Sequence, residues 1–284
     1  MKTPIRIQPL VDDGLVDHVI SRLMSGKEAD VYVVQCQGEI RCAKVYKDAA
    51  QRSFKKAVTY QEGRKVRNSR RSRAMEKGSK YGRQQQEASW QNAEIDALAK
   101  LHEAGVRVPE TFGCLDGVLL MELIVDEQGD VAPRLGDVTM PSDQALEDHA
   151  ILMNYIQRML CAGLVHGDLS EFNVLVDQYG PVIIDLPQAV DATANNHAKS
   201  MLMRDIQNMT NYFGLFAPEL LKSRYGHEMW ELYEKGDLTA DTKLTGKFKM
   251  PTKSANVDAV MGEIKAILEE ESMRQERLKA EQEE

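Results

Sequence analysis

The sequence has little cysteine and no long apolar segment. No run approaches the roughly 18 consecutive apolar residues that a membrane-spanning helix needs, and no apolar stretch follows a basic start, so we expect neither a membrane span nor a signal peptide. The cysteines form no C-x-x-C pair, which favours reduced structural thiols over a metal site; they are Cys36, Cys42, Cys114 and Cys161. Because 43% of the 284 residues are hydrophobic, the chain has enough apolar side chains for a real core. We therefore predict a folded cytoplasmic protein without a membrane partner.

Charge is distributed very unevenly along the chain. The formal net charge is −8, yet the segment from Arg52 to Arg83 has a net charge of +10, which leaves −18 for the remainder. A basic segment in an acidic protein predicts a salt-sensitive contact with a polyanion such as RNA, or with an acidic protein. A solvated loop without a partner is the alternative.

Two short segments carry the chemistry. Residues 164–176 read L-V-H-G-D-L-S-E-F-N-V-L-V, and residues 182–185 read V-I-I-D. Their aliphatic runs are separated by D-Q-Y-G-P, so they predict a β-hairpin whose outer ends meet. Asn173 and Asp185 would then lie close together, with Asp168 on the preceding loop. One carboxylate and one carboxamide are sufficient protein ligands for Mg²⁺, which otherwise binds water and phosphate. The alternative is that the aspartates only cap turns.

Hydrophobic patterning predicts the other elements. We expect strands over 18–24, 29–36, 40–46 and 118–124, and helices over 84–104, 145–162, 198–213, 218–225 and 227–234. Lys44 lies among strand aliphatics and needs a counterion or a phosphate, unless its ammonium only reaches out to solvent. Glu94 is the best counterion candidate on the next helix, with Glu87 as the alternative. This order predicts an α+β, bilobal, protein-kinase-like fold: a small N-lobe sheet with a helix C, and a mostly helical C-lobe.

The same pass along the chain predicts its organisation. We expect an N-terminal extension (1–17), an N-lobe (18–124) with a basic flexible insertion (52–83), a C-lobe (125–235), a linker (236–256), and a C-terminal amphipathic helix with a charged tail (257–284).

Several motifs together resemble those of the RIO kinases. S-G-K-E-A-D-V-Y at 25–32 is similar to the phosphate-loop motif of that family, and L-M-E at 120–122 is similar to its hinge. H-G-D-L-S-E-F-N at 166–173 and I-D-L-P-Q-A-V at 184–190 resemble its catalytic and metal-binding loops. The resemblance implies a short, type-1-like prokaryotic member: an atypical serine/threonine protein kinase or ATPase that uses ATP and Mg²⁺, with Mn²⁺ as an alternative metal.

The resemblance also implies roles for individual residues. Asp168 would orient or deprotonate the acceptor hydroxyl, while Asn173 and Asp185 would hold the metal. Asp185 could also accept phosphate itself. The remaining nucleotide contacts implied are Lys44, paired with Glu94, at the phosphates; Ser25 and Lys27 in the phosphate loop; and the backbone of Glu122 and Ile124 at adenine.

Departures from ordinary protein kinases limit what the resemblance implies. Gly167 stands where H-R-D kinases have an arginine that reads an activation-loop phosphate, so we predict activity without such a phosphate. The peptide-docking part of the C-lobe is missing, which leaves the protein substrate unspecified, and autophosphorylation is an alternative. Two other functions stay open: a small-molecule phosphotransferase, and a nucleotide-switched factor that binds ribosomal RNA or the ribosome through Arg52–Arg83. The oligomeric state does not follow from the sequence.

Overall fold

The computed structural model describes residues 2–26, 29–47 and 93–249. Lys27, Glu87, the basic insertion, and the C-terminal helix and charged tail predicted within 257–284 lie outside the described residues. The chain divides into two compact units, Met1–Lys247 and Phe248–Glu284. The elements below all belong to the first unit, and the predicted domain boundaries stay predictions.

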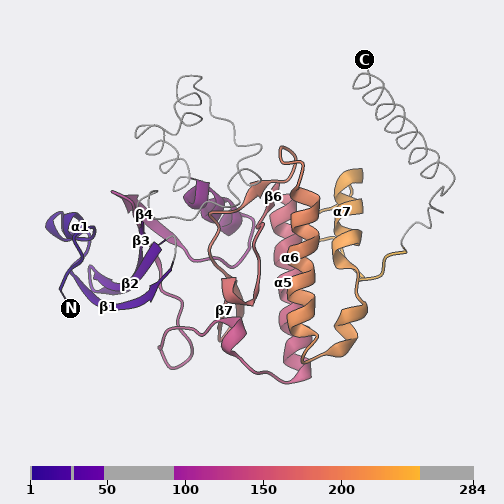
Figure 1. The fold of residues 1–284 in the computed structure, drawn as a ribbon, viewed down its shortest axis with the longest axis horizontal. Helices are drawn as coiled ribbons and strands as arrows, with labels where there is room; N and C mark the ends of the chain where they lie inside the picture. Colours follow the sequence, from indigo (N-terminus) through magenta and orange to yellow (C-terminus); the bar gives the residue numbers. More distant parts are fainter. Residues whose placement is uncertain (1, 27–28, 48–92, 250–284) are drawn as a thin grey trace, which may run out of the picture. The chain divides into compact units, whose positions relative to one another are not determined.

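A five-stranded antiparallel sheet forms the N-terminal part (Figure 1), with strand order β1-β2-β3-β5-β4. The strands are β1 (His18–Ser25), β2 (Ala29–Cys36), β3 (Glu39–Tyr46), β4 (Thr111–Leu115) and β5 (Val118–Glu122). The four strands expected from the sequence are confirmed, although β5 ends two residues earlier than predicted. β4 was not predicted, because this edge strand is mostly exposed and contains Gly113, so it lacks the apolar alternation of a strand.

Each face of the sheet is covered by a helix. The short helix α1 (Gln8–Asp12) belongs to the predicted N-terminal extension, and its Leu10 joins Val34, Ala43 and other strand residues in one apolar cluster. The described part of the following helix covers residues 93–103, and its buried Leu98 and Leu101 share a second cluster with Leu119 of β5. Because β3 is buried along most of its length between these layers, it can hold a charged side chain in a dry environment.

Three helices run side by side in the C-terminal part of this unit (Figure 1): α5 (Ser142–Cys161), α6 (Ala198–Phe213) and α7 (Tyr225–Lys235). The apolar spacing that predicted them supplies their common core. The predicted helix over 218–225 is instead a 3₁₀-helix, η4 (Pro218–Lys222), which Pro218 begins. Within the described ranges, no helix is both long and apolar enough to cross a bilayer.

The predicted hairpin is confirmed between the sheet and the helices. β7 (Val174–Asp177) pairs with β8 (Gly180–Ile183), and the 3₁₀-helix η3 (Glu171–Asn173) leads into it. The Ile184 N–H donates to the Asn173 carbonyl at 3.0 Å, so the outer ends of the hairpin meet as expected. A short pair of strands, β6 (Leu164–Val165) and β9 (Val190–Asp191), flanks the same loops.

Candidate active site

A cavity of about 710 Å³ lies between the sheet and the hairpin. Six of the residues singled out from the sequence line this cavity: Lys44, Glu94, Glu122, Ile124, Asn173 and Asp185. Ser25 and Asp168 are not in its lining, although Gly26 and Asn173 beside them are. Apolar side chains from β1, β2, β5 and β7 form much of its walls, including Met24, Val31 and Leu175. A cavity of this size with mostly apolar walls and a few polar side chains is typical of small-molecule sites.

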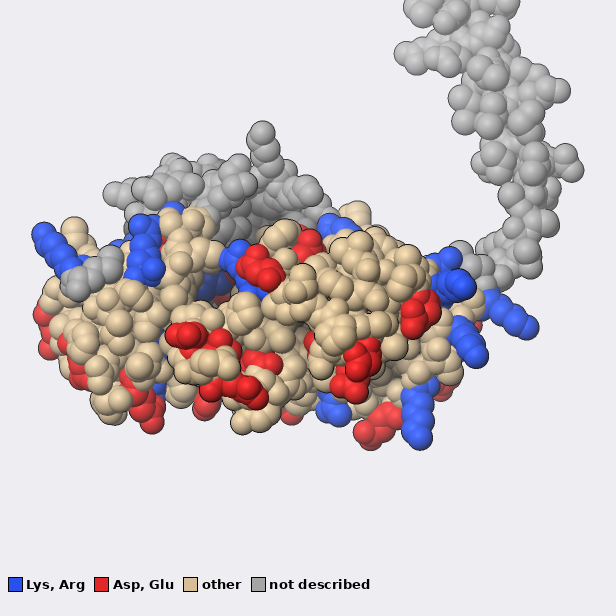
Figure 2. Space-filling view, turned by 90° about the horizontal axis from the view of Figure 1, so that it is seen from below, with Lys and Arg blue, Asp and Glu red and all other residues tan. Residues whose placement is uncertain are grey.

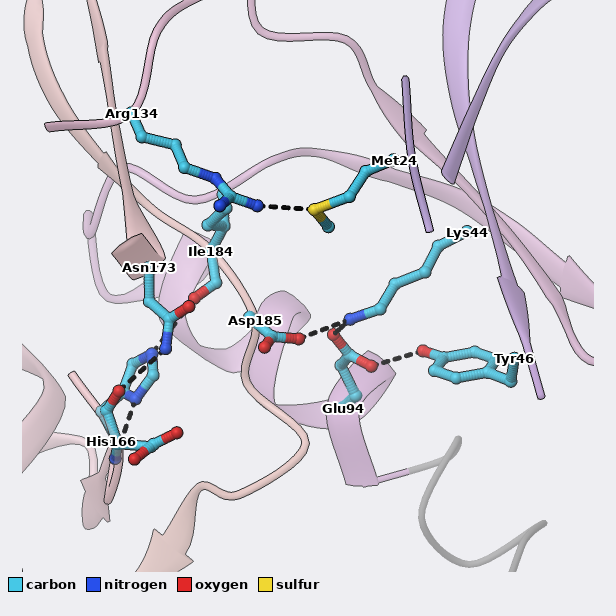
Figure 3. A network of polar contacts seen from close by, with 10 residues as sticks. Met24, Lys44, Tyr46, Glu94, Arg134, His166, Asn173, Ile184 and Asp185 are labelled. Carbon is cyan, nitrogen blue, oxygen red and sulfur yellow. Dashed lines mark hydrogen bonds and ion pairs between the residues drawn. The ribbon is translucent and has the colours of Figure 1, made fainter. Parts of the chain in front are cut away.

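Lys44 is the centre of a buried polar network (Figure 3). Its ammonium lies 2.6 Å from Glu94 Oε1 and 2.8 Å from Asp185 Oδ1. The Tyr46 hydroxyl donates to Glu94 Oε2 at 2.5 Å. Lys44 and Tyr46 are two residues apart on β3, so both point to the same side of the sheet. The pairing of Lys44 with Glu94 expected from the sequence is therefore present.

The groups of this network stabilise one another in their charged forms. Burial alone would lower the pKa of Lys44, but Asp185 and Glu94 outweigh it and raise this pKa well above its ordinary value. The Lys44 ammonium in turn lowers the pKa of Asp185. With two carboxylates, Glu94 and Asp185, and one ammonium, Lys44, these three groups together have a net charge of −1. Because 42% of the Asp185 side chain is exposed, and Oδ2 has no hydrogen-bond partner among the described residues, that carboxylate can accept a cation.

Asp185 has an unusual backbone conformation for its residue type. Its φ of 66° lies in the left-handed region, which costs a non-glycine residue on the order of 1 kcal/mol. The buried side chain of Leu186 and the bond between Ile184 and Asn173 hold the backbone on either side. Such strain at a cavity wall is typical of functional positions.

The loop around Asp168 is held by its neighbours. The buried His166 donates from Nε2 to the Ile184 carbonyl at 3.1 Å and accepts from the Asp168 N–H at Nδ1, at 3.3 Å. Burial lowers the pKa of His166, which agrees with this neutral tautomer. The Asn173 amide nitrogen donates to the Asp168 carbonyl at 2.8 Å, which leaves the Asn173 side-chain oxygen as an acceptor. The loop is thus fixed while the Asp168 side chain stays exposed.

Sequence reasoning missed the role of Asp205 on α6. Its carboxylate accepts from the Gly167 N–H at 2.7 Å and from the Leu169 N–H at 3.1 Å, one on either side of Asp168. Burial raises the pKa of Asp205 to about 7 although both amides favour the charged form. Arg204 donates to the Gly167 carbonyl. One feature of the sequence could have indicated this role: Asp205 lies on the predicted buried face of an amphipathic helix, where a carboxylate needs hydrogen-bond donors.

Gly167 itself has a φ of 81°, in the left-handed region that favours glycine. Its conformation lets both of its backbone groups reach α6.

The phosphate-loop residues that are described bind one another and Lys47, which follows β3. The Ser25 hydroxyl donates to Asp30 Oδ1 at 2.6 Å, and the Lys47 ammonium donates to the Gly26 carbonyl at 2.6 Å. Ser25 therefore uses its hydrogen on Asp30.

The expected adenine hinge is anchored by its side chain. The Glu122 carboxylate receives two bonds from Arg107, at 2.8 and 2.9 Å, and Arg107 also donates to Asp177 at 3.2 Å. Burial would raise the pKa of Glu122, but the paired guanidinium lowers it overall. The Ile124 carbonyl accepts from the Ala132 N–H, whereas the Ile124 N–H has no acceptor among the described residues. A buried N–H at a cavity wall suits a ligand nitrogen.

A protein-only metal cage is absent from the described ranges, where no group of three or more His, Cys, Asp or Glu side chains could hold an ion. The oxygen donors of Asp185 and Asn173 fit a metal that completes its shell with water and phosphate, as Mg²⁺ does.

Comparison with known proteins gives one consistent result. The RIO domain family model matches residues 30–225. The RIO-type serine/threonine-protein kinase Rio1 of Haloferax volcanii is 34% identical over 210 residues, which are 73% of this chain and 67% of that protein. Human serine/threonine-protein kinase RIO1 is 30% identical over 214 residues, which are 75% of this chain but only 36% of that protein.

Solved structures confirm the predicted fold. The Rio2 kinase from Chaetomium thermophilum has a TM-score of 0.57 at 20% identity, covering 92% of this chain and 77% of that one. Its ADP/Mg²⁺-phosphoaspartate complex has a TM-score of 0.54, also at 20% identity, covering 82% and 75%. At this identity the likeness concerns the fold, which is the α+β protein-kinase-like fold expected from the order of elements.

Proposed function

This chain belongs to the RIO family of serine/threonine-protein kinases, and from that premise we propose that it transfers the γ-phosphate of ATP, bound with Mg²⁺, to a hydroxyl group of a protein or of its own chain. One observation carries the proposal: Lys44 is paired with both Glu94 and Asp185 at the wall of a cavity that Asn173 also lines. Catalysis of phosphoryl transfer depends mainly on such an arrangement, in which cationic groups and carboxylates are held in fixed positions at a cavity that excludes water.

The nucleotide is proposed to bind along this cavity. The apolar walls would cover adenine, while the backbone of Glu122 and Ile124 would bind its polar edge. Lys44 would contact the phosphates from β3, and Ser25 and Lys27 would contact them from the phosphate loop. For Ser25, this requires exchanging Asp30 for a phosphate oxygen as acceptor, a change between two charged acceptors of similar strength.

The metal is proposed to bind at Asp185 and Asn173. When bound, Mg²⁺ would neutralise charge that develops on the phosphate oxygens. The protein keeps Asp185 ionised through Lys44 and keeps the Asn173 amide oriented through the Asp168 carbonyl.

Asp168 is proposed to receive the proton of the acceptor. The hydroxyl oxygen would form a bond to the γ-phosphorus, the bond from that phosphorus to the bridging oxygen of ADP would break, and the hydroxyl proton would pass to the Asp168 carboxylate. Asp205 and Arg204 act through the loop backbone, holding Asp168 in place from both sides.

Asp185 is a second acceptor that the geometry favours. It is ionised, 42% exposed at its side chain, and beside the ammonium proposed to contact the phosphates. The Rio2 complex with ADP/Mg²⁺ contains a phosphoaspartate. Attack by an Asp185 oxygen would release ADP without moving a proton, and hydrolysis of the acyl phosphate would complete an ATPase cycle.

The decisive experiment uses γ-labelled ATP with Mg²⁺ and compares the wild type with Asp168→Asn. We expect the substitution to lower phosphoryl transfer about 10²- to 10⁴-fold, the range for a positioned proton acceptor. Asp241→Asn is the matched control, because Asp241 is an exposed aspartate outside the cavity lining. Equal transfer by the wild type and Asp168→Asn would contradict the role of Asp168.

Mapping the label separates the acceptors. Acid-stable label on serine or threonine would support kinase activity, whereas hydroxylamine-labile label that disappears in Asp185→Asn would support the acyl-phosphate route. Label found only on an added small alcohol would instead identify a small-molecule phosphotransferase.

A further inference from the structure

Arg134 is a basic residue of the cavity to which the proposed function gives no role. Among the described residues that line the cavity, the basic side chains are Lys44 and Arg134. Lys44 is already balanced by two carboxylates, whereas no carboxylate of the described chain lies within ion-pairing distance of Arg134. The positive charge of Arg134 is therefore available to a ligand.

The immediate partner of Arg134 is a poor one. Its guanidinium contacts the sulfur of Met24, on β1 just before the phosphate loop (Figure 3). A thioether is a weak acceptor without charge, so it cannot compensate a half-buried guanidinium. An anion entering the cavity would be a far better partner, because a guanidinium binds phosphate oxygens through two parallel N–H groups.

The backbone that carries Arg134 is held on both sides. Arg134 forms an isolated bridge with Leu175 of β7, and the preceding Pro133 carbonyl accepts from the Val176 N–H at 3.0 Å. Arg134 then begins the 3₁₀-helix η2 (Leu135–Asp137), whose Leu135 is fully buried and bound at its carbonyl by Tyr212. The guanidinium thus extends from a fixed position, which limits the entropy lost on binding.

Arg134 lies at the proposed nucleotide site. It lines the same cavity as Asp185 and Asn173, the two residues proposed to hold the metal. An anion bound in this cavity therefore has the Arg134 guanidinium on one of its walls.

We propose that Arg134 binds a phosphate group of the nucleotide from the segment after the hinge, while Lys44 acts on the phosphates from the sheet. The inference rests on the proposed function, because it concerns the same nucleotide. If so, the affinity for a nucleotide depends on whether it carries a phosphate that reaches Arg134.

Calorimetric titration tests this without measuring catalysis. The wild type, Arg134→Gln and Arg134→Lys would each be titrated with adenosine, AMP, ADP and ATP in the presence of Mg²⁺. Arg134→Gln should bind ATP about tenfold or more weakly, the usual effect of losing a charge-assisted hydrogen bond, while its affinity for adenosine changes less than about twofold. Arg134→Lys should recover part of the loss. The shortest nucleotide that shows the loss identifies which phosphate is bound.

Arg224→Gln is the matched control, since Arg224 is exposed and outside the cavity lining. It removes the same charge and should bind all four ligands as the wild type does. Retained adenosine binding by Arg134→Gln also shows that this variant is folded.

Three results would overturn the inference. Unchanged ATP affinity in Arg134→Gln would show that the guanidinium does not contact phosphate. An equal loss for adenosine and ATP would assign Arg134 to packing against Met24. A wild type that binds no ATP at all would refute the proposed function together with the inference, whereas the first two results leave the proposed function intact.

Discussion

A single hydroxyl group decides how the pair of Lys44 and Glu94 is held. Glu94 is 2% exposed, and its two carboxylate oxygens have different partners. The Lys44 ammonium donates to Oε1, and the Tyr46 hydroxyl donates to Oε2. Both donors come from β3, so the strand alone holds the carboxylate in place whether or not phosphate competes for Lys44.

Tyr46→Phe tests this at the level of one atom. The substitution leaves Glu94 Oε2 buried without that donor, which should cost about 1–3 kcal/mol in the free energy of unfolding measured with denaturant. ATP turnover should fall with it, because Lys44 alone then holds the Glu94 carboxylate in place.

Tyr32→Phe is the comparison for this variant. Tyr32 is also a buried strand tyrosine, but it lies in the cluster with α1 rather than at the cavity. If both variants lost the same stability and activity, the bond between Tyr46 and Glu94 would have no special role.

The sequence was informative about residues wherever chemistry left few choices. A lysine among strand aliphatics calls for a counterion, which limited the choice to Glu94 or Glu87, and the structure pairs Lys44 with Glu94; the confirmed hairpin brings Asn173 and Asp185 to one cavity. Tyr46 could not be assigned in this way, because a strand tyrosine ordinarily serves packing. Asp205 was missed because its partners are backbone amides, which no side-chain pattern reveals.

At the scale of elements, the contact among α5, α6 and α7 contains a buried histidine. His149 of α5 lies 3.3 Å from the Thr210 hydroxyl of α6, and its ring packs against Phe213 of α6 and Tyr225 of α7. Burial lowers the pKa of His149 from 6.5 to about 4. The folded protein therefore keeps this ring neutral over a range in which the unfolded chain protonates it.

This difference predicts a loss of stability in acid. Between pH 6.5 and about 4 the unfolded chain binds a proton that the folded chain does not, so the free energy of unfolding should fall by about 1.4 kcal/mol per pH unit, to a total on the order of 3 kcal/mol. Denaturant titrations of the wild type and His149→Gln across this range should show a shallower acid dependence in the variant. His18→Gln, at an exposed histidine of β1, should retain the wild-type slope.

Elements with a strong apolar period were predictable, and those without one were not. α5 and α6 have long apolar faces and lie where the spacing placed them, although α5 begins at Ser142 rather than 145. α1 is only five residues long with Pro9 near its start, too short for a helical period to appear. β4 forms because β5 offers it a pairing edge, which is a tertiary cause that its own sequence does not contain.

At the scale of the whole molecule, the basic segment Arg52–Arg83 differs in net charge from the rest of the chain. Acidic and basic side chains are interspersed on the face shown in Figure 2, whereas Arg52–Arg83, outside the described residues, has a net charge of +10. If the chain acts as the RNA- or ribosome-binding factor left open by the sequence, this segment would bind RNA electrostatically.

Neutralising Arg70, Arg71 and Arg73 to alanine should weaken RNA binding and flatten its salt dependence. If each contacts one phosphate of a single strand, the slope of log affinity against log salt should shrink by about 2. The control replaces Lys243, Lys247 and Lys249, which are exposed and outside the basic segment. Binding that is independent of salt, or equal in the two triple variants, would exclude the electrostatic contact.

The left-handed backbone of Gly167 bears on how this protein could acquire a switch. Replacing Gly167 with arginine, as in H-R-D kinases, would put a side chain on a backbone at φ 81°. Relaxing that backbone would withdraw its N–H from Asp205 and its carbonyl from Arg204. Substituting arginine at this position alone would therefore not create control by an activation-loop phosphate. Evolution or protein engineering would also have to replace the hydrogen bonds that now join this loop to α6.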